Sequence, residues 1–254
     1  RPPEHFTYEL FLDDQGQKIS KSSGNGISID EWLTYASPES LSYFMYQKPK
    51  TAKRLYFDVI PKAVDEYHQQ LRVFGTQDFK SKATNPIFHI HGNTAPKSDM
   101  VVPFSMLLNL AAVANAEDKD QLWGFIKRYA QDASPENNPQ LDQAASFAIS
   151  YYNDFVKPQK VYRLPNTTER EALMDLRSML SDFKGNRDAE ELQSIVFACG
   201  REKFDPLREW FTALYEVLLG ASQGPRFGGF IALYGIEETI QLIEKALDGV
   251  FVKD

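Results

Sequence analysis

Cysteine is almost absent from this chain of 254 residues, which has one, Cys199. A single thiol cannot form an internal disulfide, so the sequence excludes a disulfide framework and fits a reducing cytoplasm, where we expect the protein to act. Cys199 lies among apolar residues at helical spacing, which favours a buried core position over a nucleophile. Histidine is also scarce, with four residues. We therefore predict no metal centre, because zinc takes three or four ligands and no Cys or His cluster supplies them.

The chain also lacks long apolar runs and an excess of positive charge. No segment approaches the roughly 18 uninterrupted apolar residues of a membrane helix, so we expect no membrane partner. The net charge of −7 argues against non-specific nucleic-acid binding through a general basic field. A local cluster of Lys and Arg could still contact a specific nucleic acid. The start at Arg1 has neither methionine nor a signal peptide, which indicates a piece of a longer protein.

What the chain does have is a cationic loop of small residues, Lys18-Ile19-Ser20-Lys21-Ser22, followed by Ser23-Gly24-Asn25-Gly26. Lysine ammonium groups on flexible stems suit phosphate oxygens. The run from Phe6 to Leu12 predicts a strand before this loop, and Ser28 caps a predicted helix after it. For the five residues taken alone, an ordinary solvated loop is the better interpretation. Their position between a strand and a helix favours phosphate binding.

The five residues resemble the KMSKS signature of class I aminoacyl-tRNA synthetases, with Ile19 in place of methionine. Further blocks resemble the class I lysyl-tRNA synthetases of the archaeal type, which also occur in some bacteria. These blocks begin at Trp32, Pro103, Ala114, Leu122, Gly224 and Phe230. Because they extend over nearly the whole chain, we identify it by resemblance as the carboxyl-terminal portion of such an enzyme, from the KMSKS loop onward.

The resemblance implies a mainly α fold in two parts. Residues 1–75 would be the end of the catalytic domain, with the lysine loop and a small α/β stem-contact segment. Residues 76–254 would be an irregular α-helical bundle, the α-helix cage that binds the anticodon. The helical part also follows from the residues themselves, since apolar residues recur at helical spacing in most segments after Val101.

The resemblance also implies the chemistry: a lysine–tRNA ligase that activates lysine with ATP, accompanied by Mg²⁺, and transfers it to tRNA(Lys). Lys21 and Lys18 would be catalytic, and Lys18, Ser20, Lys21 and Ser22 would bind ATP. The lysine and adenine pockets would lie in an amino-terminal half that this chain lacks. We therefore expect a monomer that does not activate lysine by itself.

Aromatic and basic residues are the expected contacts to the unpaired bases of the anticodon loop, because bases stack on rings and on guanidinium planes. Tyr162-Arg163 and Arg226-Phe227 are the predicted nucleic-acid contacts. Core packing accounts equally well for Tyr162 and Phe227. Trp123 and Trp210 lie on apolar helical faces and are predicted to be core residues.

Local patterns give further expectations. His89 and His91 alternate as on a strand, which would point both rings the same way, and we interpret them as a structural or surface pair. Thr168 and Glu171 have the spacing of a capping box at the start of a helix. The basic residues Lys48, Lys50, Lys53 and Arg54 fit a solvated loop or a tRNA backbone contact.

Two other functions remain open at this stage. The chain could be a free-standing helical tRNA-binding or regulatory module that has the loop without a catalytic partner. It could also be an unrelated helical scaffold that binds protein. An upstream HIGH-like element would favour the synthetase over the first alternative, and failure to bind any tRNA would favour the second.

Overall fold

The structure is a computed structural model that describes residues 3, 5, 7–20 and 22–252. The chain forms two compact units, residues 1–105 with 138–147, and residues 106–137 with 148–254. The division runs through two helices, α6 (Phe104–Ala114) and α8 (Pro139–Tyr151). These compact units differ from the predicted functional parts, 1–75 and 76–254, which stay a prediction. The predicted fold class, mainly α, is confirmed.

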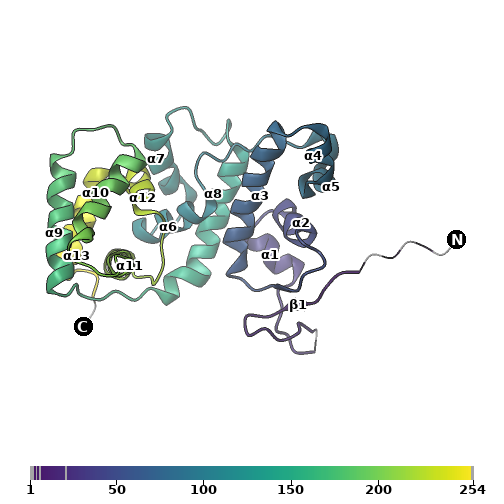
Figure 1. Cartoon of the computed structure of the whole chain (residues 1–254), viewed down its shortest axis with the longest axis horizontal. Coiled ribbons are helices and arrows are strands. Elements are labelled where there is room, and N and C mark those ends of the chain that lie inside the picture. Colours follow the sequence, from purple (N-terminus) through teal and green to yellow (C-terminus); the bar gives the residue numbers. More distant parts are fainter. Residues whose placement is uncertain (1–2, 4, 6, 21, 253–254) are drawn as a thin grey trace. The chain divides into compact units, whose positions relative to one another are not determined.

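The first unit contains two short strands and several helices before α6 (Figure 1). These are β1 (Phe11–Leu12), α1 (Ile29–Tyr35), α2 (Pro38–Tyr46), β2 (Lys53–Arg54), α3 (Val59–Thr76), α4 (Phe79–Thr84), α5 (Pro86–His91) and the 3₁₀ turn η1 (Gly92–Thr94).

The strand predicted from Phe6 to Leu12 is much shorter in the structure. Only Phe11 and Leu12 form β1, which pairs in parallel with Lys53 and Arg54 of β2. The earlier described residues of that run do not form a strand, because their β-prone side chains meet no long partner strand, and Phe6 lies outside the described residues.

The helices after the lysine loop begin where their caps predict. Ser28 accepts a hydrogen bond from the Glu31 amide at 3.2 Å, and the Glu31 carboxylate accepts from the Ser28 amide at 2.7 Å, a complete capping box. Ser37 caps α2, with Pro38 at the first helical position. These caps fix where the chain leaves the loop.

The core of the first unit lies between α2, α3 and α5. Tyr67, Leu71 and Phe74 of α3 are buried there with Tyr43 and Ile87. The buried residues of α3 recur at the spacing of one helical face.

His89 and His91, interpreted as a structural or surface pair, lie on the helix α5 rather than on a strand. Asn85 accepts a hydrogen bond from the Ile87 amide at 3.0 Å, and Pro86 follows it at the first helical position. A cap and an N1 proline specify a helix start. Two alternating residues, His89 and His91, are too few to specify a strand against that signal.

The second unit is a helical bundle. It consists of most of α6, the end of α8, α7 (Lys119–Tyr129), the π turn η2 (Tyr152–Val156), the 3₁₀ turn η3 (Lys157–Gln159), α9 (Thr167–Asp182), α10 (Ala189–Arg201), α11 (Arg208–Leu214), the π turn η4 (Tyr215–Leu219), α12 (Phe227–Tyr234) and α13 (Ile236–Leu247). Within it, α9 packs against α10 and α13, and α12 packs against α10 and α7 (Figure 1).

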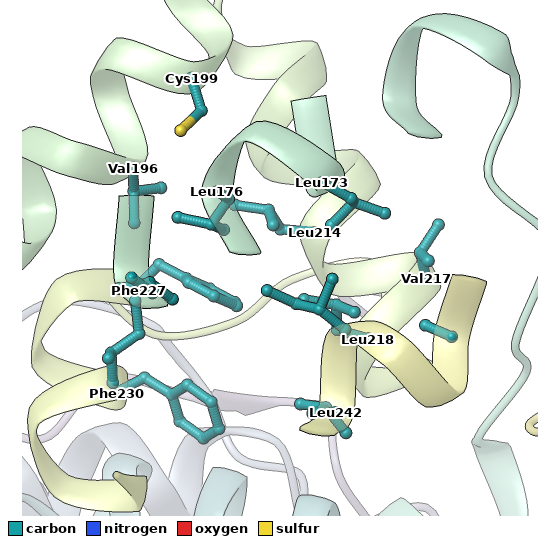
Figure 2. Close-up of a cluster of buried hydrophobic side chains, with 14 of the residues drawn as sticks. Leu173, Leu176, Val196, Cys199, Leu214, Val217, Leu218, Phe227, Phe230 and Leu242 are labelled. Atoms are coloured by element: carbon teal, nitrogen blue, oxygen red, sulfur yellow. The ribbon is translucent and has the colours of Figure 1, made fainter. Parts of the chain in front are cut away.

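A cluster of apolar side chains fills the centre of this bundle (Figure 2). Leu176 of α9, Val196 of α10 and Leu214 of α11 are fully buried in it. Cys199 is buried at its edge with its sulfur 3.5 Å from the sulfur of Met179, and burial raises the pKa of the thiol to about 11. The prediction that Cys199 is a core residue is confirmed, as are those for Trp123 and Trp210.

The capping box predicted at Thr168 and Glu171 was wrong by two residues. Asn166 is the N-cap of α9, and its side chain accepts from the Glu169 amide at 2.9 Å, while Glu169 accepts from the Asn166 amide at 2.8 Å. Asparagine is at least as good an N-cap as threonine. Glu169 is also held by Arg163, which favours this register.

The backbones of α12 and α10 approach each other closely at Gly228. A Cβ atom at Gly228 would overlap the backbone of Ala189 and Gln193. The Gly228 amide donates to the Gln193 side-chain oxygen at 2.8 Å, in a buried position. At the next residue, Gly229, a Cβ would meet only the Met106 methyl group, at 3.5 Å. The packing thus requires glycine at position 228 but not at position 229.

Among the described residues, no helix combines the length and the apolar character needed to cross a bilayer.

Gly228→Ala should lower the free energy of unfolding by about 1–3 kcal/mol, because the added methyl group pushes α12 away from α10. Gly229→Ala is the matched control and should be neutral or stabilising by up to about 1 kcal/mol, since alanine favours the helix and the Met106 side chain can move. Urea unfolding of both variants measures the difference. Equal effects of the two substitutions would contradict the close packing.

Candidate active-site loop and nucleic-acid contacts

The lysine loop follows a tight reversal at the end of β1. The amide of Asp13 donates to the carbonyl of Gln17 at 2.8 Å, and the amide of Ile19 donates to the carbonyl of Phe11 at 3.0 Å. Gly16, in the turn, has a φ of +80°, a conformation that favours glycine. The loop therefore starts from a short hairpin rather than from a free strand end.

A buried carboxylate joins this turn to the far side of the loop. Asp13 accepts from the amides of Gln15 and Gln17, at 3.0 and 2.7 Å, and from the Asn25 side-chain nitrogen at 2.7 Å. Asn25 in turn accepts from the Ser20 amide at 3.1 Å. The hydrogen bond from Asn25 first, and then those from the backbone, hold the pKa of Asp13 below its ordinary value. We call this hydrogen-bonded pair the Asp13–Asn25 clasp.

The hydroxyl groups of the loop face one another. The Ser20 oxygen lies 2.6 Å from that of Ser23 and 3.2 Å from that of Ser22. The Gly24 amide, at a φ of +62°, donates to the Ser20 carbonyl at 3.2 Å. Hence the predicted ATP-binding residues Ser20 and Ser22 lie together on a folded turn.

Of the two predicted catalytic lysines, Lys18 is among the residues that the structure describes. Lys18 is exposed and lies opposite Leu12 in an antiparallel bridge. Lys21 lies outside the described residues. Between them, Ile19 is half-buried and packs so closely on Gly26 that a Cβ there would overlap its side chain. The Ile19 contact supplies the apolar anchor expected at the methionine position of the signature.

Arg163, a predicted nucleic-acid contact, is held by two carboxylates. Its guanidinium donates to both oxygens of Glu169, at 2.6 and 2.8 Å, and to Glu216 at 2.6 Å. Glu169 is 6% exposed. Burial pushes the pKa of Glu169 upward, but the bonds from Arg163 and Asn166 outweigh it and keep the pKa below its ordinary value. Arg163 thus stabilises the start of α9.

Arg226 makes a similar pair in a different environment. Its guanidinium donates to both oxygens of Glu190, each at 2.6 Å. The two side chains are 61% and 68% exposed, so the pair stands in water, where such ion pairs contribute little to stability. Arg226 is therefore accessible to a ligand phosphate or base in a way that Arg163 is not.

The two aromatic candidates are packed inside the protein. Phe227 is fully buried in the central cluster (Figure 2). Tyr162 is half-buried, stacks on Phe251 at a centroid distance of 5.0 Å, and has the Lys160 nitrogen 5.1 Å from its ring centroid. Burial raises the pKa of the Tyr162 hydroxyl to about 12. Core packing accounts for Phe227, and neither ring is freely exposed.

His89 and His91, the residues considered as metal ligands, each contact a tyrosine. His91 lies 2.9 Å from the Tyr67 hydroxyl, and His89 stacks on Tyr46 at 5.8 Å between centroids. In the part of the chain that the structure describes, no three His, Cys, Asp or Glu side chains are arranged to hold a metal ion.

Comparison with known proteins shows what the chain is similar to. Residues 1–94 match the family model described as tRNA synthetases class I (K). The whole chain is 72% identical to the lysine–tRNA ligase of Roseobacter denitrificans, of which it covers 48%. Over 250 residues, or 97% of this chain, it is 48% identical to the lysine–tRNA ligases of Rickettsia conorii and of Rickettsia bellii, again covering 48% of each. The chain thus spans about half the length of these curated relatives.

These matches first confirm the resemblance to the class I aminoacyl-tRNA synthetases, which the family model shows over residues 1–94. They then confirm the particular resemblance predicted from the sequence, to the class I lysyl-tRNA synthetases, over the whole of this chain.

The ion pairs of the two arginines predict destabilisation of different size when each arginine is replaced. Arg163→Leu should lower the free energy of unfolding by about 2 kcal/mol, because it leaves the buried Glu169 carboxylate without its partner. Arg226→Leu is the matched control and should cost about 0.5 kcal/mol or less, since its pair is exposed. Thermal or urea unfolding measures both. A loss for Arg226→Leu as large as that for Arg163→Leu would refute the structural role of Arg163.

Proposed function

We propose that this chain is the carboxyl-terminal part of a lysine–tRNA ligase, which activates lysine with ATP and transfers it to tRNA(Lys). The observation that carries the proposal is the folded KMSKS-like loop in a chain 72% identical to a lysine–tRNA ligase over all of its residues. Because the chain spans 48% of that relative, the activity is proposed for the whole protein. We assign the lysine and adenine pockets to the other half, and this polypeptide alone does not activate lysine.

The loop would act on the phosphates of ATP. In activation, the lysine carboxylate attacks the α-phosphate and pyrophosphate leaves, so negative charge develops on the leaving group. Ammonium groups held at that position lower the barrier. We assign this role to Lys21, assisted by Lys18, with the hydroxyls of Ser20 and Ser22 as donors to the phosphate oxygens. The Asp13–Asn25 clasp supports the assignment, because it shapes the loop before ATP arrives.

ATP would bring Mg²⁺ with it. Magnesium in such sites keeps several waters and binds through substrate phosphates and one or two carboxylates. That mode does not require a cluster of protein ligands in this chain. When bound, the ion neutralises phosphate charge, and the loop lysines supply the remaining positive charge.

The helical part would hold tRNA(Lys). Residues 1–75 would carry the loop and the stem-contact segment, and residues 76–254 the anticodon-binding bundle. The exposure of Arg226 supports a direct contact to the anticodon loop. The other predicted contacts would act indirectly, by holding in place the helices that form this surface. They are Arg163, Tyr162 and Phe227. We further propose that the protein acts in the cytoplasm as a monomer.

Lysine-dependent exchange of pyrophosphate into ATP tests the assignment. The whole protein should catalyse it, and Lys21→Ala should lower kcat by about 10²- to 10³-fold, because one charge-stabilising donor is lost. Lys184→Ala is the control, since Lys184 is an exposed lysine in the turn before α10 and should leave the rate unchanged. Measurable exchange by this chain alone, or equal rates for the two variants, would refute the proposal.

A further inference from the structure

The first unit contains a cavity that none of the sequence predictions included. It has a volume of about 160 Å³ and lies among α2, α3, α5 and the part of α8 that belongs to this unit. We call it the Gln140 cavity. It has room for several water molecules or for a ligand of a few carbon atoms. The side chains used below are Glu39, Val64, Tyr67, Gln140, Ala144 and Phe147.

Gln140 gives the wall of this cavity a hydrogen-bond acceptor without a partner. Its side-chain nitrogen donates to the Lys97 carbonyl at 3.1 Å, and its amide donates to the Asp99 carboxylate at 3.1 Å. A carbonyl only accepts, so the NH₂ group must face Lys97, which fixes the identity of the side-chain oxygen. Among the described residues, that oxygen is the one buried side-chain polar atom with no hydrogen-bond partner. Such an acceptor costs free energy unless a water or a ligand donates to it.

The charge at the cavity is negative. Glu39, in the first turn of α2, is half-buried and is the one acid among the described lining residues, which include no lysine or arginine. Burial first, and then the charge of Glu39, raises the pKa of the Tyr67 hydroxyl, so the field of the carboxylate reaches the cavity wall. The Gln140 cavity therefore favours a cation over an anion.

The nearby basic groups do not offset Glu39. Burial lowers the pKa of His68 to about 4, with a smaller effect from Arg72, so His68 is neutral at neutral pH. Arg72 is not among the lining residues, and its guanidinium donates to the Met100 carbonyl at 3.4 Å. His91 lies with its Nε2 atom 2.9 Å from the Tyr67 hydroxyl.

The rest of the wall is aromatic and aliphatic. The centroid of the Tyr67 ring lies 4.9 Å from that of His68 and 6.1 Å from that of His91. Aromatic rings attract cations through their faces. The side chains of Val64 and Phe147 also line the cavity, and apolar surface of this kind favours methylene groups over water. The wall suits a charged group on a short alkyl chain better than a hydrated inorganic ion.

We propose that the Gln140 cavity binds one primary ammonium group on a short alkyl chain. An ammonium group has three donors and no acceptor. One donor would meet the Gln140 oxygen and another the Glu39 carboxylate, while the methylene groups would lie along Val64 and Phe147. Free lysine and the polyamines both present this group. The inference does not rest on the proposed function, because binding of an amine here requires neither ATP nor tRNA.

The test is titration of this chain with butylamine at neutral pH, followed by NMR through the ring protons of Tyr67 and His68. Both sets of signals should shift and reach saturation. The neutral analogue 1-butanol and the anion butyrate should bind at least about tenfold more weakly, because neither brings a positive charge to Glu39. Lysine and 1,4-diaminobutane then distinguish the sources of the ammonium group, since tighter binding of one over the other identifies an amino acid or a polyamine as the ligand.

Glu39→Gln should weaken butylamine binding by about tenfold or more, because the amide keeps the shape of the side chain and removes its charge. Glu237→Gln is the matched control, since it makes the same change at an exposed residue in the first turn of a helix, α13, outside the first unit. It should leave the affinity unchanged.

Ala144→Leu tests the location, because a larger side chain at this buried lining position fills the cavity. It should abolish the shifts in a protein that urea unfolding shows to be folded. If this variant does not fold, Glu39→Gln decides alone. Three results would overturn the inference: no saturable shift with butylamine, which leaves water as the occupant, equal binding of 1-butanol, or an unchanged affinity in Glu39→Gln. None of them bears on the proposed function, which pyrophosphate exchange tests.

Discussion

The contact of α12 with α10 at Gly228 is the constraint on which the second unit depends. The backbones approach so closely that no side chain fits between them, and the buried bond between Gly228 and Gln193 fixes their register. This packing determines where both ends of α12 lie. At one end Arg226 emerges into solvent beside the buried Phe227, and at the other Tyr234 stacks on Phe125 of α7. One glycine thus links the core to the surface that we assign to tRNA.

In the first unit, the buried carboxylate of Asp13 is the group on which the shape of the lysine loop depends. Apart from Ile19, which packs on Gly26, the lysine loop consists of small and charged residues, which hold little shape by apolar packing. Its shape comes from Asp13, which collects hydrogen bonds from the turn before the loop and from Asn25 after it. Preorganisation of this kind matters for phosphate chemistry, because the positive charges must be in place when the leaving group develops its charge. Serine and glycine at the intervening positions permit the tight turn.

Local signals in the sequence predicted much of the fold, whereas contacts distant in sequence were not predictable. The cap at Ser28 and the helical spacing of apolar residues after Val101 predicted their helices, since each signal depends on residues within a few positions. The likeness to the KMSKS signature also located the loop, but not the Asp13–Asn25 clasp, because a pairing across 12 residues leaves no local pattern. The hydrogen bond from Arg163 to Glu216, which lies 53 residues away in the sequence, was likewise not predictable.

The central proposal is that the helical part of this chain binds the anticodon end of lysine tRNA. Hydroxyl-radical cleavage of that tRNA, with and without the chain bound, tests it most directly, because cleavage reports backbone burial at every nucleotide. The account predicts protection concentrated in the anticodon loop and its stem, and weaker or absent protection for a tRNA with a different anticodon. Protection spread evenly over the molecule, or absent from the anticodon loop, would contradict it.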